Sequence, residues 1–310
     1  MSIHPVALAR WYTRSRRWFR SQGMGYLFVA PTVAFLLIFT AYPLLRAVVM
    51  SLSEVSKKGE IGRLIGVSNW PLLAADDRFL LAIGRSLQFS ALGMLGSLIL
   101  GVMLAQLLNQ RWLPSRLTGL LRGLSVLPWM FATAVAALMW GLLLHRDGLF
   151  NSGLAQLGLV ERPVMFVGNP DLALGSLAGV FVWRVTPFVM VMVLAALKSI
   201  PQELYEAAAV DGASRWQVYR QITLPLLMPL LLTLAILSFV WGVGQFDLIR
   251  IITGGGPMSA TEVVSYYIYR VGFLTLDWSY GSTLSVAVFL VNLCFAMVYL
   301  YLSRWARPWE

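Results

Sequence analysis

The sequence predicts an all-α membrane protein with six transmembrane helices. The chain is 58% hydrophobic and 12% charged, whereas soluble proteins average about 25% charged residues. Its mean hydropathy is +0.73. A helix needs about 20 apolar residues to cross the hydrocarbon core of a bilayer, and six stretches reach that length. These predicted spans are residues 26–45, 86–108, 124–144, 174–197, 226–243 and 284–302.

The distribution of lysine and arginine predicts that both termini face the cytoplasm. Five arginines and no acid precede the first span, whereas the loops 145–173 and 244–282 carry two basic residues each. The segment 46–85 has six basic residues but also four acids, and the positive-inside rule weakens for long segments. We therefore expect that segment outside. Residues 1–24 are interpreted as a basic cytoplasmic segment and residues 25–310 as the transmembrane domain.

The composition argues against several classes of function. The chain has two histidines, His4 and His145, one cysteine, Cys294, and no HExxH, CxxC or GxxxxGK[ST] motif. We therefore expect no catalytic residues, no metal site and no cofactor on this chain. The net charge of +10 does not indicate nucleic-acid binding, because the basic residues form clusters between apolar runs rather than one solvated face. The glycines of 254–256 lack the lysine of a phosphate loop and predict a flexible turn.

Residues 198–225 predict two short cytoplasmic helices that meet at a sharp corner. Gly212 follows a run of alanines, and glycine supplies the left-handed conformation that ends many helices. The second helix is expected to end at Pro225. Serine and glutamine at positions i and i+3 form a capping box at a helix start. Two such pairs occur, Ser199 with Gln202 and Ser214 with Gln217.

This corner carries small side chains, which have two explanations. Alanine is chosen in many helices for its propensity alone. Alternatively, a surface with little side-chain bulk allows another protein to approach closely. Glu206 either pairs with a basic residue of such a partner or is simply solvated. Asp211 either contacts the partner or only caps the helix. The small residues are Ala207, Ala208, Ala209, Gly212 and Ala213.

The order of residues at the corner is specific. Glu206-Ala207-Ala208 is followed after three residues by Gly212 and after nine more by Ile222-Thr223-Leu224-Pro225. This pattern resembles the cytoplasmic signature, or EAA motif, of membrane subunits of binding-protein-dependent ATP-binding cassette (ABC) importers. Further stretches are similar to the maltose-type and glycerol-3-phosphate-type permeases of that family, so that the resemblance covers about residues 80–305. They are residues 246–249, 253–257, 261, 266–269 and 277–281.

The resemblance implies a permease subunit of a sugar importer in the bacterial plasma (inner) membrane. Its substrate would be a disaccharide or an oligosaccharide, and the membrane lipid would surround it. The implied protein partners are a second similar permease, an extracytoplasmic substrate-binding protein and two ATPase subunits, which use the ATP and Mg. A short coupling helix between the fourth and fifth spans would dock on the ATPase. Its coupling residues would be Glu206, Ala207, Ala208, Asp211, Gly212 and Ala213.

Polar residues at membrane depth are costly and are functional hypotheses by default. Trp183 and Arg184 lie in the fourth span, and Gln245 and Asp247 follow the fifth. Tryptophan faces stack on sugar rings, and the polar groups bind hydroxyls, so the four residues are candidates for substrate binding. Interfacial tryptophan, an Arg184–Asp247 pair and a backbone contact of Gln245 are the structural alternative. The sequence leaves both interpretations open.

Two other features bear on the class of protein. Gly93, Gly96 and Gly101 in the second span predict close helix packing. An ion-coupled secondary transporter or a channel that works without an ATPase is the main alternative function. Such a protein would more often carry a membrane-buried acid or paired broken helices, and the six predicted spans contain no acid. The sequence therefore favours the importer.

Overall fold

The computed structural model describes residues 26–110 and 114–305, and five of its helices are long and apolar enough to cross a membrane. A sixth span results when the bent pair Arg116–Met130 and Thr133–Leu143 is counted as one. Each predicted span thus corresponds to one of these units. The predicted basic segment 1–24 lies outside the described residues. The five single helices are Tyr26–Ser51, Asp77–Leu108, Pro170–Ser199, Arg215–Val243 and Trp278–Met297.

The first span continues six residues beyond its predicted end. A π-helical turn, η1 (Leu37–Ala41), precedes α2 (Tyr42–Ser51). Pro43 lacks an amide hydrogen, and a π-helical turn accommodates a missing hydrogen bond. None of the most apolar 18 residues of this span is buried, so the first span lies at the periphery of the molecule.

A β-hairpin follows the first span, so the prediction of an all-α chain is wrong at this point. Strands β1 (Ser53–Val55) and β2 (Ile61–Leu64) pair antiparallel. Their turn contains Gly59 with φ +82°, a conformation that glycine adopts without steric cost. A short helix, α3 (Trp70–Ala75), leads from the hairpin into the next span.

The centre of the fold is the pair α4 (Asp77–Leu108) and α8 (Pro170–Ser199). A Cβ atom at Gly93, Gly96 or Gly101 would lie 2.5–2.6 Å from a side chain of α8. Only glycine allows the two helices to approach this closely, which confirms the predicted close packing. The main core contains Phe89, Leu177, Phe181, Met190, Leu227, Leu234, Leu248 and Ile249.

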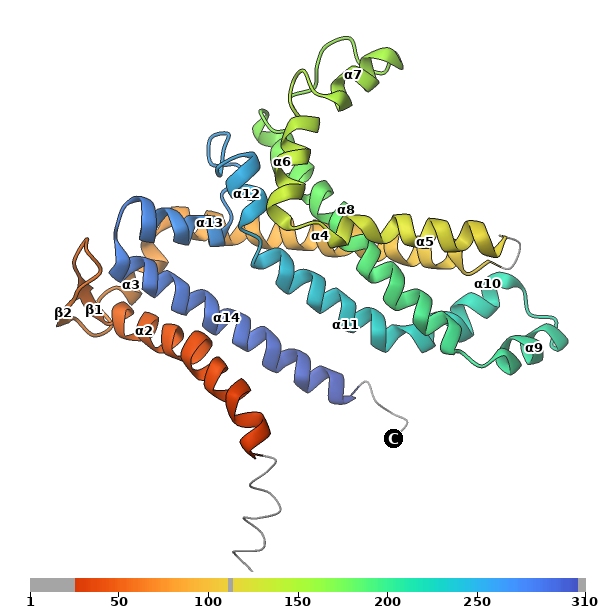
Figure 1. Ribbon diagram of the computed structural model, residues 1–310, viewed down its shortest axis with the longest axis horizontal. Coiled ribbons are helices and arrows are strands. Elements are labelled where there is room, and N and C mark those ends of the chain that lie inside the picture. The colour runs from red at the N-terminus through yellow and green to blue at the C-terminus, as the bar shows by residue number, and fades with distance from the viewer. Residues whose placement is uncertain (1–25, 111–113, 306–310) are drawn as a thin grey trace, which may run out of the picture.

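The third span is broken, and its prediction as one continuous helix over 124–144 is wrong. Helices α5 (Ser115–Met130) and α6 (Thr133–Leu143) meet at an angle of 98°. Pro128 weakens the last turn of α5 because it cannot donate a backbone hydrogen bond, and Phe131 and Ala132 then adopt extended conformations. The bend directs α6 away from the axis of α5 (Figure 1).

The remaining elements include the two ends of the molecule. The corner formed by α9 and α10 lies at one end of the long axis, and the β-hairpin lies at the opposite end (Figure 1). The bounds are α7 (Leu149–Gln156), α9 (Gln202–Val210), α10 (Arg215–Val218), η2 (Tyr219–Thr223), α11 (Leu224–Val243), α12 (Asp247–Ile252), α13 (Val264–Tyr269), η3 (Arg270–Leu274) and α14 (Trp278–Trp305).

Candidate coupling corner and transport pathway

The corner between α9 and α10 is fixed by backbone hydrogen bonds. Gly212 has φ +71°, and its amide donates to the carbonyl of Ala209 at 3.2 Å. The amide of Ala213 donates to the carbonyl of Ala208 at 2.9 Å. These two bonds define a Schellman motif, in which the glycine turns the chain at the helix end. The predicted role of Gly212 as helix terminator is confirmed.

Only the second predicted capping box forms. The amide of Gln217 donates to Ser214 Oγ at 3.3 Å, and the amide of Ser214 donates to Gln217 Oε1 at 2.7 Å. The first predicted box is wrong, because the Ser199 hydroxyl donates to the carbonyl of Ala196 at 2.8 Å. Helix α9 instead begins after Pro201 without a side-chain cap.

The helix that starts at the corner continues directly into the fifth span. Helical structure runs from Arg215 to Val243 without interruption, so the prediction that this helix ends at Pro225 is wrong. The π-helical turn η2 precedes Pro225 and places that proline in the first turn of α11, where a missing amide hydrogen is tolerated. Tyr205 and Thr223 share a hydroxyl hydrogen bond of 3.3 Å that ties α9 to this helix.

The outer surface of the corner differs in part from the predicted surface. Glu206, Ala207, Asp211 and Gly212 are exposed, Ala213 is half-buried, and Ala208 is buried within the loop itself. Two apolar side chains that the sequence pattern did not indicate also project from the corner. Val210 is 88% exposed and Trp216 is 66% exposed. Their exposure makes the corner a candidate surface for contact with another protein.

A second group of residues surrounds the break in the third span. Trp183 on α8 lies 6.4 Å from Phe131 and 5.4 Å from Trp140, measured between ring centroids. One turn further along α8, Phe188 lies between Trp129, at 5.5 Å, and Trp241, at 5.2 Å. The aromatic group therefore joins α5, α6, α8 and α11.

The break explains why sequence reasoning missed most of this group. Trp129 and Phe131 flank the bend, and only their three-dimensional positions bring them against α8. They are 45% and 42% exposed, and Trp241 is 39% exposed. Non-helical backbone at membrane depth is tolerated where it is covered by protein or lines a water-filled cavity. The bend and the exposed rings beside it are thus a candidate pathway lining.

The polar candidates are distributed over the same region but do not form one cluster. Arg184 is half-buried, and its Nε is buried without a hydrogen-bond partner. Asp247 is exposed and acts on Arg184 electrostatically. Gln245 is 7% exposed, and its backbone carbonyl accepts a hydrogen bond from Ser265 Oγ at 2.7 Å. Among the described residues, Glu262 and Arg270 form an ion pair, and His145 Nδ1 lies 3.9 Å from the Asp147 carboxylate.

The glycine-rich segment near α12 forms a turn with defined internal contacts. The Thr261 hydroxyl donates to the carbonyl of Gly256 at 2.6 Å and lies 2.7 Å from the Thr253 hydroxyl. A Cβ at Gly255 would lie 2.6 Å from the ring of Tyr266. Met258, at the tip, is 89% exposed. The described residues contain no group of three or more His, Cys, Asp or Glu side chains suited to a metal ion.

The fold and these two sites define a multi-pass α-helical membrane protein with an ordered corner attached to a span and a broken, aromatic-lined span. Residues 97–308 match the family model described as "Binding-protein-dependent transport system inner membrane component". The chain belongs to this family.

Known proteins agree with this assignment. The chain is 34% identical to the trehalose/maltose transport system permease protein MalF of Thermococcus litoralis, over 93% of this chain and 96% of that protein. It is also 34% identical to the sn-glycerol-3-phosphate transport system permease protein UgpA of Yersinia pestis, over 89% and 92% of the two chains. A chain of a bacterial ABC transporter that imports the acidic polysaccharide alginate has a TM-score of 0.81 at 25% identity, over 96% of this chain and 100% of that chain.

Proposed function

We propose that this chain forms half of the translocation pathway of an ATP-driven sugar importer. A disaccharide or oligosaccharide is delivered by an extracytoplasmic binding protein, a second similar permease supplies the other half, and two ATPase subunits use ATP and Mg. The chain itself is non-catalytic. The observation that best supports this proposal is the corner at Gly212. Two backbone hydrogen bonds fix the corner, and the helix that follows it continues into the fifth span without a break.

The corner is suited to transmit movement of an ATPase to the pathway. Its exposed side chains on α9 and α10 supply the contact, with Val210 and Trp216 as apolar anchors beside Glu206 and Asp211. A rigid element that takes two positions couples two sites when each position is favoured by a different ligand. Nucleotide acts on one end of the helix 215–243, and sugar acts near Trp241 at the other end.

The proposed orientation places the corner in the cytoplasm and the β-hairpin outside, in the bacterial plasma membrane. Both termini are then inside. The arginine-rich segments before the first span and after the second span support this orientation. The loops at the hairpin end and the turn at Met258 face the binding protein.

Substitutions at Gly212 test the coupling role. A Cβ at this position meets no atom within 4 Å. Within the chain, a substitution therefore costs only the backbone strain of φ +71°, about 1–2 kcal/mol for most residues. Alanine pays the same strain as leucine but adds little side-chain bulk. We expect Gly212→Leu to leave the complex in the membrane but to abolish sugar-stimulated ATP hydrolysis and transport, because the side chain prevents docking. Gly212→Ala is the matched control and should retain substantial coupling. Full transport by Gly212→Leu would contradict the proposal.

Broken spans also occur in ion-coupled secondary transporters. Ion-coupled transport is therefore the alternative function. Family membership argues against that alternative. The only acids in the described spans, Asp77 and Asp171, lie in the first turns of α4 and α8. Neither is placed at the middle of a span, where an ion-coupling carboxylate is expected.

A further inference from the structure

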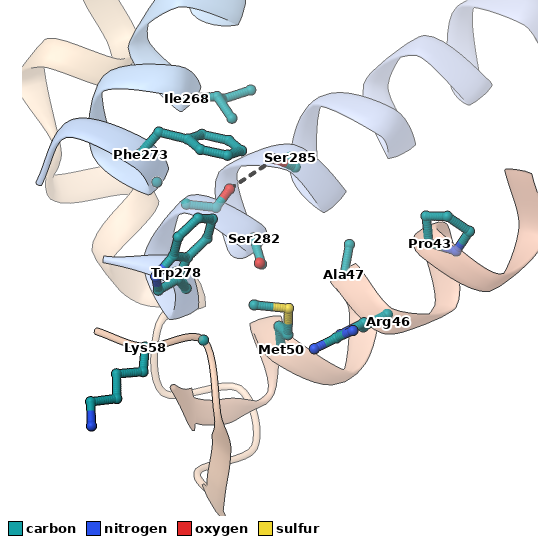
Figure 2. A pocket seen from close by; sticks show the side chains of 13 residues that line it. Pro43, Arg46, Ala47, Met50, Lys58, Ile268, Phe273, Trp278, Ser282 and Ser285 are labelled. Carbon is teal, nitrogen blue, oxygen red and sulfur yellow. Dashed lines mark hydrogen bonds between the residues drawn. The ribbon is translucent and has the colours of Figure 1, made fainter. Parts of the chain in front are cut away.

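A groove of about 450 Å³ lies between the first span and the last helix at the hairpin end (Figure 2). One wall is α2, the opposite wall is the start of α14, and η3 and the hairpin turn close the remaining sides. The mouth is held in place because Trp278 Nε1 donates to the carbonyl of Lys57 at 3.2 Å and Ser279 Oγ donates to the carbonyl of Ser53 at 2.6 Å. The groove is separate from the aromatic pathway and from the corner.

The groove extends along the direction of the spans. On α14 its wall reaches from Trp278 to Ser285, and on α2 from Pro43 to Met50. Both segments belong to candidate membrane spans. At 1.5 Å per residue each wall is roughly 10 Å long. Tryptophan favours the interface between water and lipid, so Trp278 marks the polar end and the rest of the groove extends into the apolar layer.

The charges along the groove are positive. Arg46 and Lys58 line it, and no acidic residue does. Neither residue takes part in the ion pairs found in residues 26–110 and 114–305. Figure 2 shows the Lys58 side chain directed away from the centre of the groove, so its contribution is a long-range one. Arg46 lies on a span, five residues before its end, where its long side chain reaches headgroup depth and attracts an anionic group.

The remaining lining residues suit an amphiphile. Figure 2 shows the Ser282 hydroxyl pointing into the space between α14 and α2, and it makes no hydrogen bond to the described residues. The neighbouring Ser285 hydroxyl, in contrast, donates to the carbonyl of Gly281 at 2.9 Å. Ala47 and Pro43 provide apolar surface further from Trp278. A cationic and hydroxyl-bearing mouth above apolar walls fits an anion that carries a hydrocarbon chain.

We propose that this groove binds an anionic phospholipid of the surrounding bilayer. The guanidinium of Arg46 and the hydroxyl of Ser282 hold the phosphate, and the first part of an acyl chain runs away from Trp278 along Ala47 and Pro43. Guanidinium and phosphate match geometrically and form charge-assisted hydrogen bonds. In the orientation proposed above, the lipid belongs to the outer leaflet. The binding itself does not depend on that orientation or on the transported sugar.

Lipid binding to the purified permease complex tests this site. Native mass spectrometry measures how much added phosphatidylglycerol stays bound, and the zwitterionic phosphatidylcholine is the comparison lipid. The wild type should retain phosphatidylglycerol preferentially, and Arg46→Gln should weaken that binding about tenfold, as expected for the loss of one charge-assisted contact. Arg78→Gln is the matched control, since Arg78 is an exposed arginine at the start of α4, which is also at the hairpin end. It should leave the affinity unchanged.

A steric variant makes the test independent of charge. Ala47→Leu fills the groove and leaves Arg46 in place, and it should also weaken phosphatidylglycerol binding. Arg46→Lys keeps the positive charge and should bind phosphatidylglycerol more tightly than Arg46→Gln. Unchanged binding in both Arg46→Gln and Ala47→Leu would overturn the proposal. So would an equal loss in Arg78→Gln, full displacement of the lipid by inorganic phosphate, or a photo-crosslink from position 282 to a protein instead of a lipid. Transport is measured separately, so a failure of the importer assignment does not affect this result.

Discussion

The carboxylate of Asp76 accepts a hydrogen bond of 2.6 Å from the hydroxyl of Tyr267, which lies 191 residues further along the chain. Tyr280 donates to the same oxygen at 2.8 Å, and the other oxygen caps α4 by accepting from the amide of Phe79 at 3.1 Å. One side chain therefore joins the start of α4 to α13 and α14. It organises the hairpin end of the molecule, opposite the corner at Gly212.

Replacement of Asp76 should destabilise this end. Asp76→Asn removes the charge that strengthens both tyrosine hydrogen bonds, and we expect a loss of about 1–2 kcal/mol in the free energy of unfolding. Thermal unfolding in detergent measures it. Asp77→Asn is the control, because Asp77 is the exposed neighbour of Asp76. An equal effect of the two substitutions would refute the role of the tyrosine contacts.

The Asp76 contribution should depend on pH. Burial raises the pKa of Asp76, but the hydrogen bonds from Tyr267, Phe79 and Tyr280 together lower it by a larger amount. The pKa therefore falls below its ordinary value of 3.8. A carboxyl with a depressed folded-state pKa stabilises the fold above its unfolded pKa and loses that effect as the pH falls through the folded pKa. The difference between wild type and Asp76→Asn should thus be constant at neutral pH and shrink below pH 3.8. A difference that grows on acidification would contradict this assignment.

The ion pair between Glu262 and Arg270 predicts an asymmetric pair of substitutions. Their side chains are 3% and 24% exposed, and the charged atoms are 2.9 Å apart. Arg270→Met leaves a buried carboxylate without its partner, and we expect a loss of about 3 kcal/mol. Glu262→Gln should cost less, because water reaches the remaining arginine. The double variant should recover much of the Arg270→Met loss in thermal unfolding, and additive losses would disprove the coupling.

Close packing of α11 against α4 depends on Gly242. A Cβ at this position would lie 2.7 Å from Ser90 Oγ and 2.8 Å from Ser90 Cα. Because one of these atoms is backbone, Gly242→Ala should overpack the contact and destabilise the protein by about 1–3 kcal/mol. Gly179→Ala on α8 meets no atom within 4 Å and should be nearly neutral. Equal unfolding temperatures for the two variants would argue against this contact.

The aromatic residues beside the broken span should affect transport of sugar. Trp129→Ala and Trp183→Ala each remove one stacking surface, about 0.5–1.5 kcal/mol, and should raise the sugar concentration for half-maximal transport by a few-fold. Basal ATP hydrolysis should stay unchanged. Phe289→Ala, which removes a similarly exposed ring on α14, is the control. Unaltered transport in both tryptophan variants would remove these rings from the pathway.

The sequence was most informative where local chemistry decides structure. Gly212 and the Ser214–Gln217 capping box depend on a few adjacent residues, so their pattern predicted the corner. Pro128 was visible in the sequence, but the bend after it depends on how α5 and α6 pack against other helices. The aromatic group around Trp183 could not be predicted for the same reason, because Trp129 and Phe131 reach it only through that bend.

Reconstitution into proteoliposomes tests the central claim most directly. This chain and its partner permease are reconstituted with and without the ATPase subunits, and uptake of a labelled disaccharide is measured with binding protein outside and ATP at the corner side. The importer account predicts uptake only when the ATPase is present, and none with the two permeases alone. Sugar uptake by the permeases without any ATPase, driven by an ion gradient, would contradict it.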